Sequence, residues 1–247
     1  MSPETVEIMG FPIHCLTMEE TLEMMAQLVE RPDTALVCTP NPEVLVAARG
    51  DDELRRALLT ADLLLPDGVG LIWASGFLGT PLPQRVTGID LVQQLFQWGQ
   101  HQGSSFYFLG GRPGVAEMAA RRVKEGYPGL KICGVRHGYY RAEEKEELLE
   151  EINCSHPDLL LVGMGVPRQE YFILEHRDQL KASLCLTVGG SFDVLAGRVK
   201  RAPVIYQRLR LEWFYRLLQE PMRWRRMLRL PAFVLLILGE RLRRGFK

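Results

Sequence analysis

Polar side chains that could do chemistry follow short apolar runs at three places in the sequence. Thr39 and Asn41 follow one run, Asp67 follows the next, and Gln169 begins a helical segment after a third. Arg85 lies in a loop between them. A carboxylate can act as a general base, amides can hold hydroxyl groups, and a guanidinium can stabilise a diphosphate. The set therefore suits a sugar hydroxyl acceptor, a general base and a diphosphate leaving group.

Each of these residues also has an ordinary structural interpretation. Asn41 could form an Asx turn, Asp67 could cap a helix, and Gln169 could be a capping residue. Arg85 could be a solvated loop charge. For any one residue the structural interpretation is the simpler one, and only their shared position at strand ends favours a site.

Several common site motifs are absent from the sequence. It contains no D-x-D, G-x-S-x-G or H-E-x-x-H element, and its five histidines form no ligand-spaced cluster. We therefore expect no metal cofactor. The five cysteines form no C-x-x-C pair, and the first ten residues lack the features of a signal peptide. Both observations favour reduced cysteines and a cytoplasmic protein.

Strand-like and helix-like segments alternate through most of the chain, which predicts an α/β fold. Continuous apolar runs between amphipathic segments are typical of a Rossmann-like, mostly parallel sheet with helices on both faces. Thr17 and Glu20 have capping-box spacing at the start of a helix. Strands are predicted at 35–39, 62–65, 105–109, 130–135, 158–162 and 184–188. Helices are predicted at 17–31, 42–61 with a break near 50, 68–78, 88–102, from 113, 143–152 and from 167.

Three of the predicted strands end in glycine-rich turns. In open α/β sheets, ligands bind at the carboxyl ends of strands, where glycines let the backbone approach a phosphate. None of the turns is a G-x-G-x-x-G or a P-loop, and turn geometry alone could explain each of them. Together they favour a nucleotide-like ligand. The turns contain Gly110 and Gly111, Gly163 and Gly165, and Gly189 and Gly190.

The C-terminal segment differs from the body in charge. Residues 198–247 hold 14 of the 30 Lys and Arg residues but only three of the 30 acidic ones, so the body is acidic and the tail basic. Two helices are predicted there, at 205–218 and 222–238. We expect a core at 1–200 and a basic helical appendage at 201–247. Such an asymmetry implies an anionic partner for the tail.

The apolar stretch 230–239 suggests what that partner is. Its ten residues fall well short of the ~20 needed to cross a bilayer. Flanking arginines suit a helix that lies on an anionic membrane surface. Packing on the body, or on a second copy of the chain in a homo-oligomer, is the alternative. The charge also fits nucleic acid, but no nucleic-acid motif accompanies it, so no such partner is expected.

The same segments resemble the WecG/TagA/CpsF family of glycosyltransferases (family 26), over essentially the whole chain and in order. The matching stretches are Thr39-Pro-Asn-Pro-Glu43, Ala61–Gly70, Arg85-Val-Thr-Gly88, Phe108-Leu-Gly-Gly111, Val162–Glu170, Val188–Asp193 with Gly197, Arg201-Ala-Pro203, Leu211–Arg216, Glu220-Pro and Arg223-Trp-Arg-Arg226.

The resemblance implies a peripheral enzyme on the cytoplasmic face of the bacterial membrane. Its donor would be a UDP-activated N-acetylmannosamine, a related uronic acid or another hexose. Its acceptor would be N-acetylglucosamine on undecaprenyl pyrophosphate, in the synthesis of teichoic acid, enterobacterial common antigen or exopolysaccharide. Members of the family are understood to invert the configuration at the anomeric carbon, and to do so without a metal.

The resemblance also assigns roles to residues. Asp67 would be the catalytic base, and Thr39, Asn41, Arg85 and Gln169 would line the sugar-binding site. The nucleotide would be surrounded by Gly110, Gly111, Gly163, Gly165, Gly190 and Asp193, with Arg216, Arg223 and Arg226 closing over the diphosphate.

Two questions stay open at this level. Burial would raise the pKa of Asp67, whereas a helix N-terminus beside it would lower that pKa. The second question is whether the chain catalyses anything, because a non-catalytic UDP- or lipid-binding module with a membrane-binding tail would share the glycine-rich turns and the basic helix.

Overall fold

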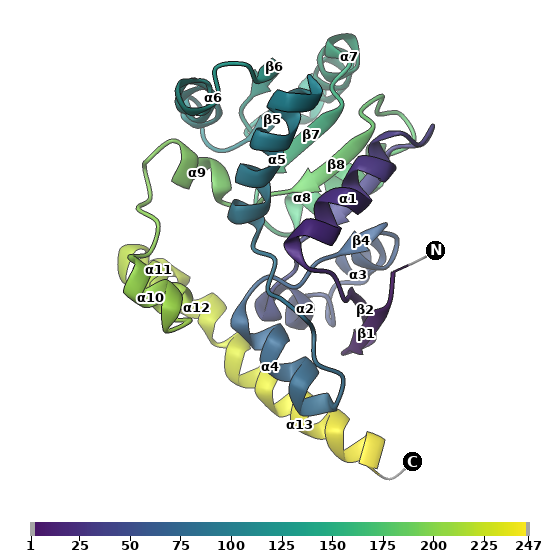
Figure 1. The fold of residues 1–247 in the computed structure, drawn as a ribbon, viewed down its shortest axis with the longest axis vertical. Coiled ribbons are helices and arrows are strands. Elements are labelled where there is room, and N and C mark those ends of the chain that lie inside the picture. Colours follow the sequence, from purple (N-terminus) through teal and green to yellow (C-terminus); the bar gives the residue numbers. More distant parts are fainter. Residues whose placement is uncertain (1–2, 246–247) are drawn as a thin grey trace.

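The fold is built on a six-stranded sheet in which every strand runs parallel (Figure 1). The computed structural model describes residues 3–245. The strand order is β4-β3-β8-β7-β5-β6, so the carboxyl ends of all six strands lie at the same edge of the sheet. The strands are β3 (Ala35–Cys38), β4 (Leu63–Leu64), β5 (Ser105–Gly110), β6 (Lys131–Arg136), β7 (Leu159–Gly163) and β8 (Leu184–Thr187).

Helices cover both faces of the sheet, as the apolar strands require. Alternate strand residues point to opposite faces, so Leu36 and Cys38 join one hydrophobic cluster while Ala35 and Val37 join another. The second cluster is closed by α1 (Met18–Val29), α5 (Gly88–Gln102), α6 (Val115–Gly126) and α9 (Ser191–Leu195). The first is closed by α2 (Pro42–Ala47), α3 (Asp52–Leu59), α4 (Val69–Leu78), α7 (Lys145–Ser155) and α8 (Arg168–His176).

The predicted Rossmann-like architecture is confirmed, with each expected strand and body helix in place. The capping box is present as predicted, because Thr17 accepts the Glu20 backbone N–H and the Glu20 carboxylate accepts the Thr17 N–H. A 3-10 turn, η1 (Ala142–Glu144), precedes α7. The antiparallel hairpin of β1 (Thr5–Ile8) and β2 (Phe11–His14) was not anticipated.

The two long helices predicted for the C-terminal segment are each broken. Arg210, with φ of 61°, lies in the left-handed region and separates α10 (Val204–Arg208) from α11 (Glu212–Gln219). Residues 222–238 also do not form one helix. The segment contains η2 (Pro221–Arg223), α12 (Trp224–Met227) and α13 (Arg229–Gly245).

Helix α13 packs against the body beside α2 and α4 (Figure 1). Phe233 and Ile237 are fully buried in the first hydrophobic cluster. At the far end, Glu240 accepts the Met9 backbone N–H at 3.0 Å, and Arg244 donates to the Glu7 carbonyl at 2.6 Å. One face of α13 therefore contacts the body, which is the packing alternative raised above.

The opposite face of α13 is open to solvent. Leu235 and Leu242 are among its exposed apolar side chains. Within residues 3–245, no helix combines the length and apolarity needed to cross a membrane.

The packing of α13 on the body can be tested by comparing a substitution on its buried side with one on its exposed side. We expect Phe233→Ala to lower the free energy of unfolding by about 3 kcal/mol, because it leaves a cavity in the core. Leu235→Ala, on the solvent side, should change it by less than about 0.5 kcal/mol. Urea denaturation of the two variants measures both values. Equal, small effects would mean that α13 does not pack on the body.

Candidate active site

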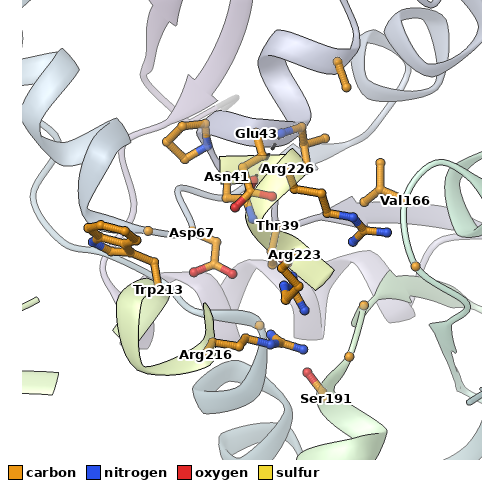
Figure 2. A pocket seen from close by; sticks show the side chains of 18 of the residues that line it. Thr39, Asn41, Glu43, Asp67, Val166, Ser191, Trp213, Arg216, Arg223 and Arg226 are labelled. Carbon is orange, nitrogen blue, oxygen red and sulfur yellow. Dashed lines mark hydrogen bonds between the residues drawn. The ribbon is translucent and has the colours of Figure 1, made fainter. Parts of the chain in front are cut away.

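A cleft of about 1350 Å³ runs along the carboxyl edge of the sheet. The loops that follow β3, β4, β5, β7 and β8 form one wall, and segments of α11, η2, α12 and α13 form the other. Most of the residues predicted for the site line this cleft. Figure 2 shows the side chains of Asp67, Arg216 and Arg223 converging from opposite walls.

Asp67 lies in the loop between β4 and α4 and is not the helix cap. Its backbone N–H donates to the Pro40 carbonyl at 3.1 Å, which ties the β4 loop to the β3 loop. The N-cap of α4 is Gly68, whose φ of 90° favours glycine. The Asp67 carboxylate therefore makes no cap and faces the cleft (Figure 2).

Burial in the cleft wall raises the pKa of Asp67 to about 6. The positive charges of Arg85 and Arg216 and the backbone of Gly88 act in the opposite direction, whereas the negative charge of Glu212 adds to the rise. Desolvation thus outweighs the effects that favour the carboxylate. A base with this pKa is largely ionised at neutral pH yet still able to take a proton.

Arg85 forms an ion pair with Glu212 of α11, and both side chains are half-buried. The pair joins the loop before α5 to the C-terminal segment across the cleft. Arg85 is therefore not the solvated loop charge of the structural interpretation. Glu212 was not anticipated as a site residue, although it lies in the Leu211–Arg216 stretch that carries part of the family resemblance.

The three predicted arginines of the C-terminal segment all line the cleft. Glu220 holds two of them together, with its carboxylate 2.8 Å from Arg223 and 3.6 Å from Arg216. Burial and the neighbouring Arg223 lower the pKa of Arg216, while Glu220, Asp67 and Asp193 raise it. Arg226 is exposed at the cleft and forms no ion pair within the described part of the chain.

Arg216 lies directly against the turn after β8. A Cβ atom on Gly190 would come within 2.2 Å of its Nη2 atom, so only glycine leaves room for the guanidinium there. The Nε atom of Arg216 is buried and faces the Glu220 carboxylate at 3.6 Å, slightly beyond hydrogen-bond distance. The two Nη atoms at the end of the guanidinium are the ones that can donate to a ligand oxygen.

Gln169 is buried and is held at both ends of its amide. Its Oε1 accepts the Gly189 backbone N–H at 3.0 Å, and its Nε2 donates to Glu170 at 2.7 Å. Glu170 is itself buried, and desolvation raises its pKa to about 7. The pair fixes the β8 turn against α8, so the structure places Gln169 in the wall with its polar atoms already paired.

Thr39 and Asn41 lie side by side in the loop after β3. The Asn41 side chain accepts the Val44 backbone N–H at 3.1 Å and caps α2, a structural role related to the Asx turn proposed for it. The Thr39 hydroxyl donates to the Thr187 carbonyl at 3.4 Å. Both residues still line the cleft, so the cap does not remove Asn41 from it.

The predicted nucleotide-site residues divide into two groups. Asp193 and the glycines at 111, 163, 165 and 190 line the cleft. Gly110 does not line the cleft; it is the last residue of β5 and pairs with Gly163 of β7. A Cβ atom there would lie 2.3 Å from the Gly163 carbonyl oxygen, so this glycine permits a close approach of two strands.

Other residues of the cleft were not predicted from the sequence. Trp213 lies beside Asp67 in Figure 2, and Trp73 of α4 adds a second indole to the wall. Arg112 and Arg168 add positive charge on the side of β5 and β7. In the sequence, only Trp213 and Arg168 fell within stretches that carry the family resemblance, Leu211–Arg216 and Val162–Glu170.

Taken together, the cleft places a carboxylate of raised pKa opposite several guanidinium groups. Such a site can remove a proton from a hydroxyl while stabilising a phosphate leaving group. Among residues 3–245, no group of three or more His, Cys, Asp or Glu side chains is arranged to hold a metal ion.

Comparison with known proteins bears on this chemistry. A protein from Bacillus spizizenii, named N-acetylglucosaminyldiphosphoundecaprenol N-acetyl-beta-D-mannosaminyltransferase, is 38% identical over 204 residues, covering 83% of this chain and 79% of its own. Proteins of the same name from Bacillus subtilis and Staphylococcus aureus are 34% identical over 206 residues and 31% identical over 231 residues. They cover 83% and 93% of this chain, and 80% and 90% of their own.

The match to a family covers nearly the whole chain. Residues 6–247 match the family described as Glycosyl transferase WecG/TagA/CpsF. The resemblance found in the sequence is thereby confirmed, and the non-catalytic alternative is not supported. The chain belongs to the WecG/TagA/CpsF family of glycosyltransferases.

Proposed function

We propose that the protein transfers N-acetylmannosamine, or a related hexose or uronic acid, from a UDP-sugar to N-acetylglucosaminyl-diphosphoundecaprenol. The names of three relatives that are 31–38% identical specify this acceptor and this sugar for those proteins. The observation that carries the proposal is the carboxylate of Asp67, which faces the cleft with a pKa of about 6 opposite Arg216.

In the proposed reaction, Asp67 takes the proton of an acceptor hydroxyl. The hydroxyl oxygen attacks the anomeric carbon from the face opposite UDP, and the bond between that carbon and the β-phosphate oxygen breaks. The configuration at the anomeric carbon inverts because attack and departure occur on opposite faces. The proton remains on Asp67 until it passes to solvent.

Negative charge develops on the diphosphate as it leaves, and arginines would balance it. Arg216, Arg223 and Arg226 line the cleft, and the Nη2 atom of Arg216 lies against the turn at Gly190. Guanidinium groups bind phosphate oxygens in a bidentate manner. We propose that they supply this charge without a metal cofactor, and that the glycines and Asp193 surround the nucleotide.

A lipid-linked acceptor requires the enzyme to work at a membrane. No described helix spans one, so we propose peripheral attachment at the cytoplasmic face, where the basic C-terminal segment meets anionic lipid. The polymer served would be a teichoic acid or another cell-surface polysaccharide.

Replacing the base tests the assignment directly. We expect Asp67→Asn to lower kcat by at least about 10²-fold, since the amide cannot accept the proton, while UDP binding by calorimetry stays intact. Asp33→Asn, at an exposed ion pair far from the cleft, is the control and should keep full transfer. Normal turnover by Asp67→Asn would rule out this carboxylate as the base.

Asp67→Asn should also be no less stable than the native protein. The pKa of Asp67 is raised from 3.8 to about 6 in the folded state, so folding favours the protonated form. Stability from this group is present below pH 4 and is lost as the pH rises through 6. At pH 7.5 the charged carboxylate opposes folding, and Asp67→Asn should raise the Tm. A clear fall in Tm would contradict the sign of this pKa shift.

The pH profile gives a separate measure of the base. We expect log kcat/KM to rise with a slope of one up to about pH 6 and then to level off, because the free enzyme must hold an ionised Asp67. Initial rates between pH 4.5 and 8, with stability checked at each pH, provide the profile. An absence of any fall below pH 6 would be inconsistent with the proposed base.

Arg216→Ala tests the charge on the leaving group. We expect kcat to fall about 10²-fold, as when a donor to a developing oxyanion is removed. Arg225→Ala is the matched control, because Arg225 is exposed, stacks on Trp224 and does not line the cleft. Native activity should also be unchanged by a chelator. Equal rates for the two variants, or loss of activity in the chelator, would argue against arginines as the source of this charge.

A further inference from the structure

One end of the cleft is apolar and continues onto the surface of the protein. Val69 and Trp73 of α4 line the cleft on one side, and Leu230 and Val234 of α13 line it on the other. This end lies away from the glycine-rich turns after β7 and β8. The cleft therefore passes from a polar, cationic region to an apolar one.

The two helices run side by side and in the same direction from this point. Gly70, near the start of α4, lies close to Phe233, since a Cβ atom there would be 3.7 Å from the Phe233 ring. At the other end, Arg241 of α13 donates to the Leu78 carbonyl at 3.4 Å. Figure 1 shows α13 alongside α4 over this length.

Each helix carries a row of exposed apolar side chains that starts in the cleft and leads outward. Trp73 and Phe77 of α4 are one turn apart and stacked, with ring centroids 5.4 Å apart. On α13 the spacing of four repeats through Val234, Leu238 and Leu242, which places them on one face of the helix. We call these five side chains the apolar track. Its α13 row extends about 12 Å beyond the cleft wall at 1.5 Å per residue.

The exposure of the track is unusual for a water-soluble surface. Trp73 is 40% and Phe77 is 38% exposed, and the three α13 residues are 40–65% exposed. Exposed aromatic residues that adjoin further apolar side chains mark a binding surface rather than isolated surface residues. Because the track is continuous with the cleft, its occupant should be joined to whatever the cleft binds.

We propose that the apolar track binds the first isoprene units of the acceptor's polyprenyl chain. This inference rests on the proposed function, in which the acceptor carries such a chain on its diphosphate. With the acceptor's diphosphate at the apolar end of the cleft, apart from the arginines proposed for UDP, the chain leaves the cleft between α4 and α13, where apolar side chains replace the water around it. The track would thereby also set the direction in which the acceptor sugar enters.

The test compares two soluble acceptors in the absence of lipid. Each is N-acetylglucosamine diphosphate, with either a single-isoprene tail or a farnesyl tail, used below its micelle concentration. The measured quantity is the ratio of kcat/KM for the farnesyl acceptor to that for the short one. Native enzyme should favour the farnesyl acceptor, since the longer tail covers more of the track.

The double variant Phe77→Ser/Leu238→Ser should reduce that ratio about tenfold, the effect of uncovering roughly one buried apolar side chain. Both residues are exposed and lie outside the cleft lining, so a large fall in Tm is not expected. Met118→Ser on α6, also exposed and apolar, is the matched control and should leave the ratio unchanged.

Two results would overturn the proposal. One is a native enzyme that uses both acceptors equally well. The other is a double variant that keeps the native ratio. If that variant also loses binding to anionic vesicles, the track contacts the bilayer instead. If native enzyme transferred sugar to neither acceptor with any UDP-sugar offered, the proposed function itself would fail, and this inference with it.

Discussion

Parallel pairing of the six strands is the constraint on which the rest of the structure depends. Because every strand points the same way, the loops after β3, β4, β5, β7 and β8 all begin at the same edge of the sheet. Because β3 and β8 are also adjacent, Thr39 comes within hydrogen-bond distance of Thr187, 148 residues away. The hydrogen bond from the Asp67 N–H to the Pro40 carbonyl then ties the loop that contains Asp67 to the loop after β3.

The C-terminal segment supplies the charged second wall of the cleft. Apolar packing against the body holds that segment in place. Glu212 pairs with Arg85, and Glu220 pairs with Arg216 and Arg223, so two carboxylates keep the cationic wall in place. Phe233 is buried in the same cluster as α4, the helix that follows the loop with Asp67. Together these contacts put positive charge opposite Asp67 without neutralising it by direct pairing, which leaves burial to dominate its pKa.

Residues that hold the backbone and residues that face the cleft are often adjacent here. Gln169 uses both ends of its amide on Gly189 and Glu170, and Asn41 caps α2, yet both line the cleft. Gly110 looks like its neighbour Gly111 in sequence, but it serves a close approach between β5 and β7. Structural and site roles are therefore not exclusive alternatives in this fold.

The order of the six parallel strands and the body helices along the chain could be predicted from the sequence, because apolar runs and the Thr17 capping box are local signals. Together with the resemblance, the sequence also predicted that Asp67, Arg216, Arg223 and Arg226 share one site, and all four line the cleft. It could not reveal the breaks at Arg210 and Leu228, since short helices depend on packing more than on propensity. Three features could be seen only in the folded chain. They are the balance of burial and charge at Asp67, the pairing of Arg85 with Glu212, and the apolar track between α4 and α13. Each of these arises between segments distant in the chain, where local pattern carries no information about distance or desolvation.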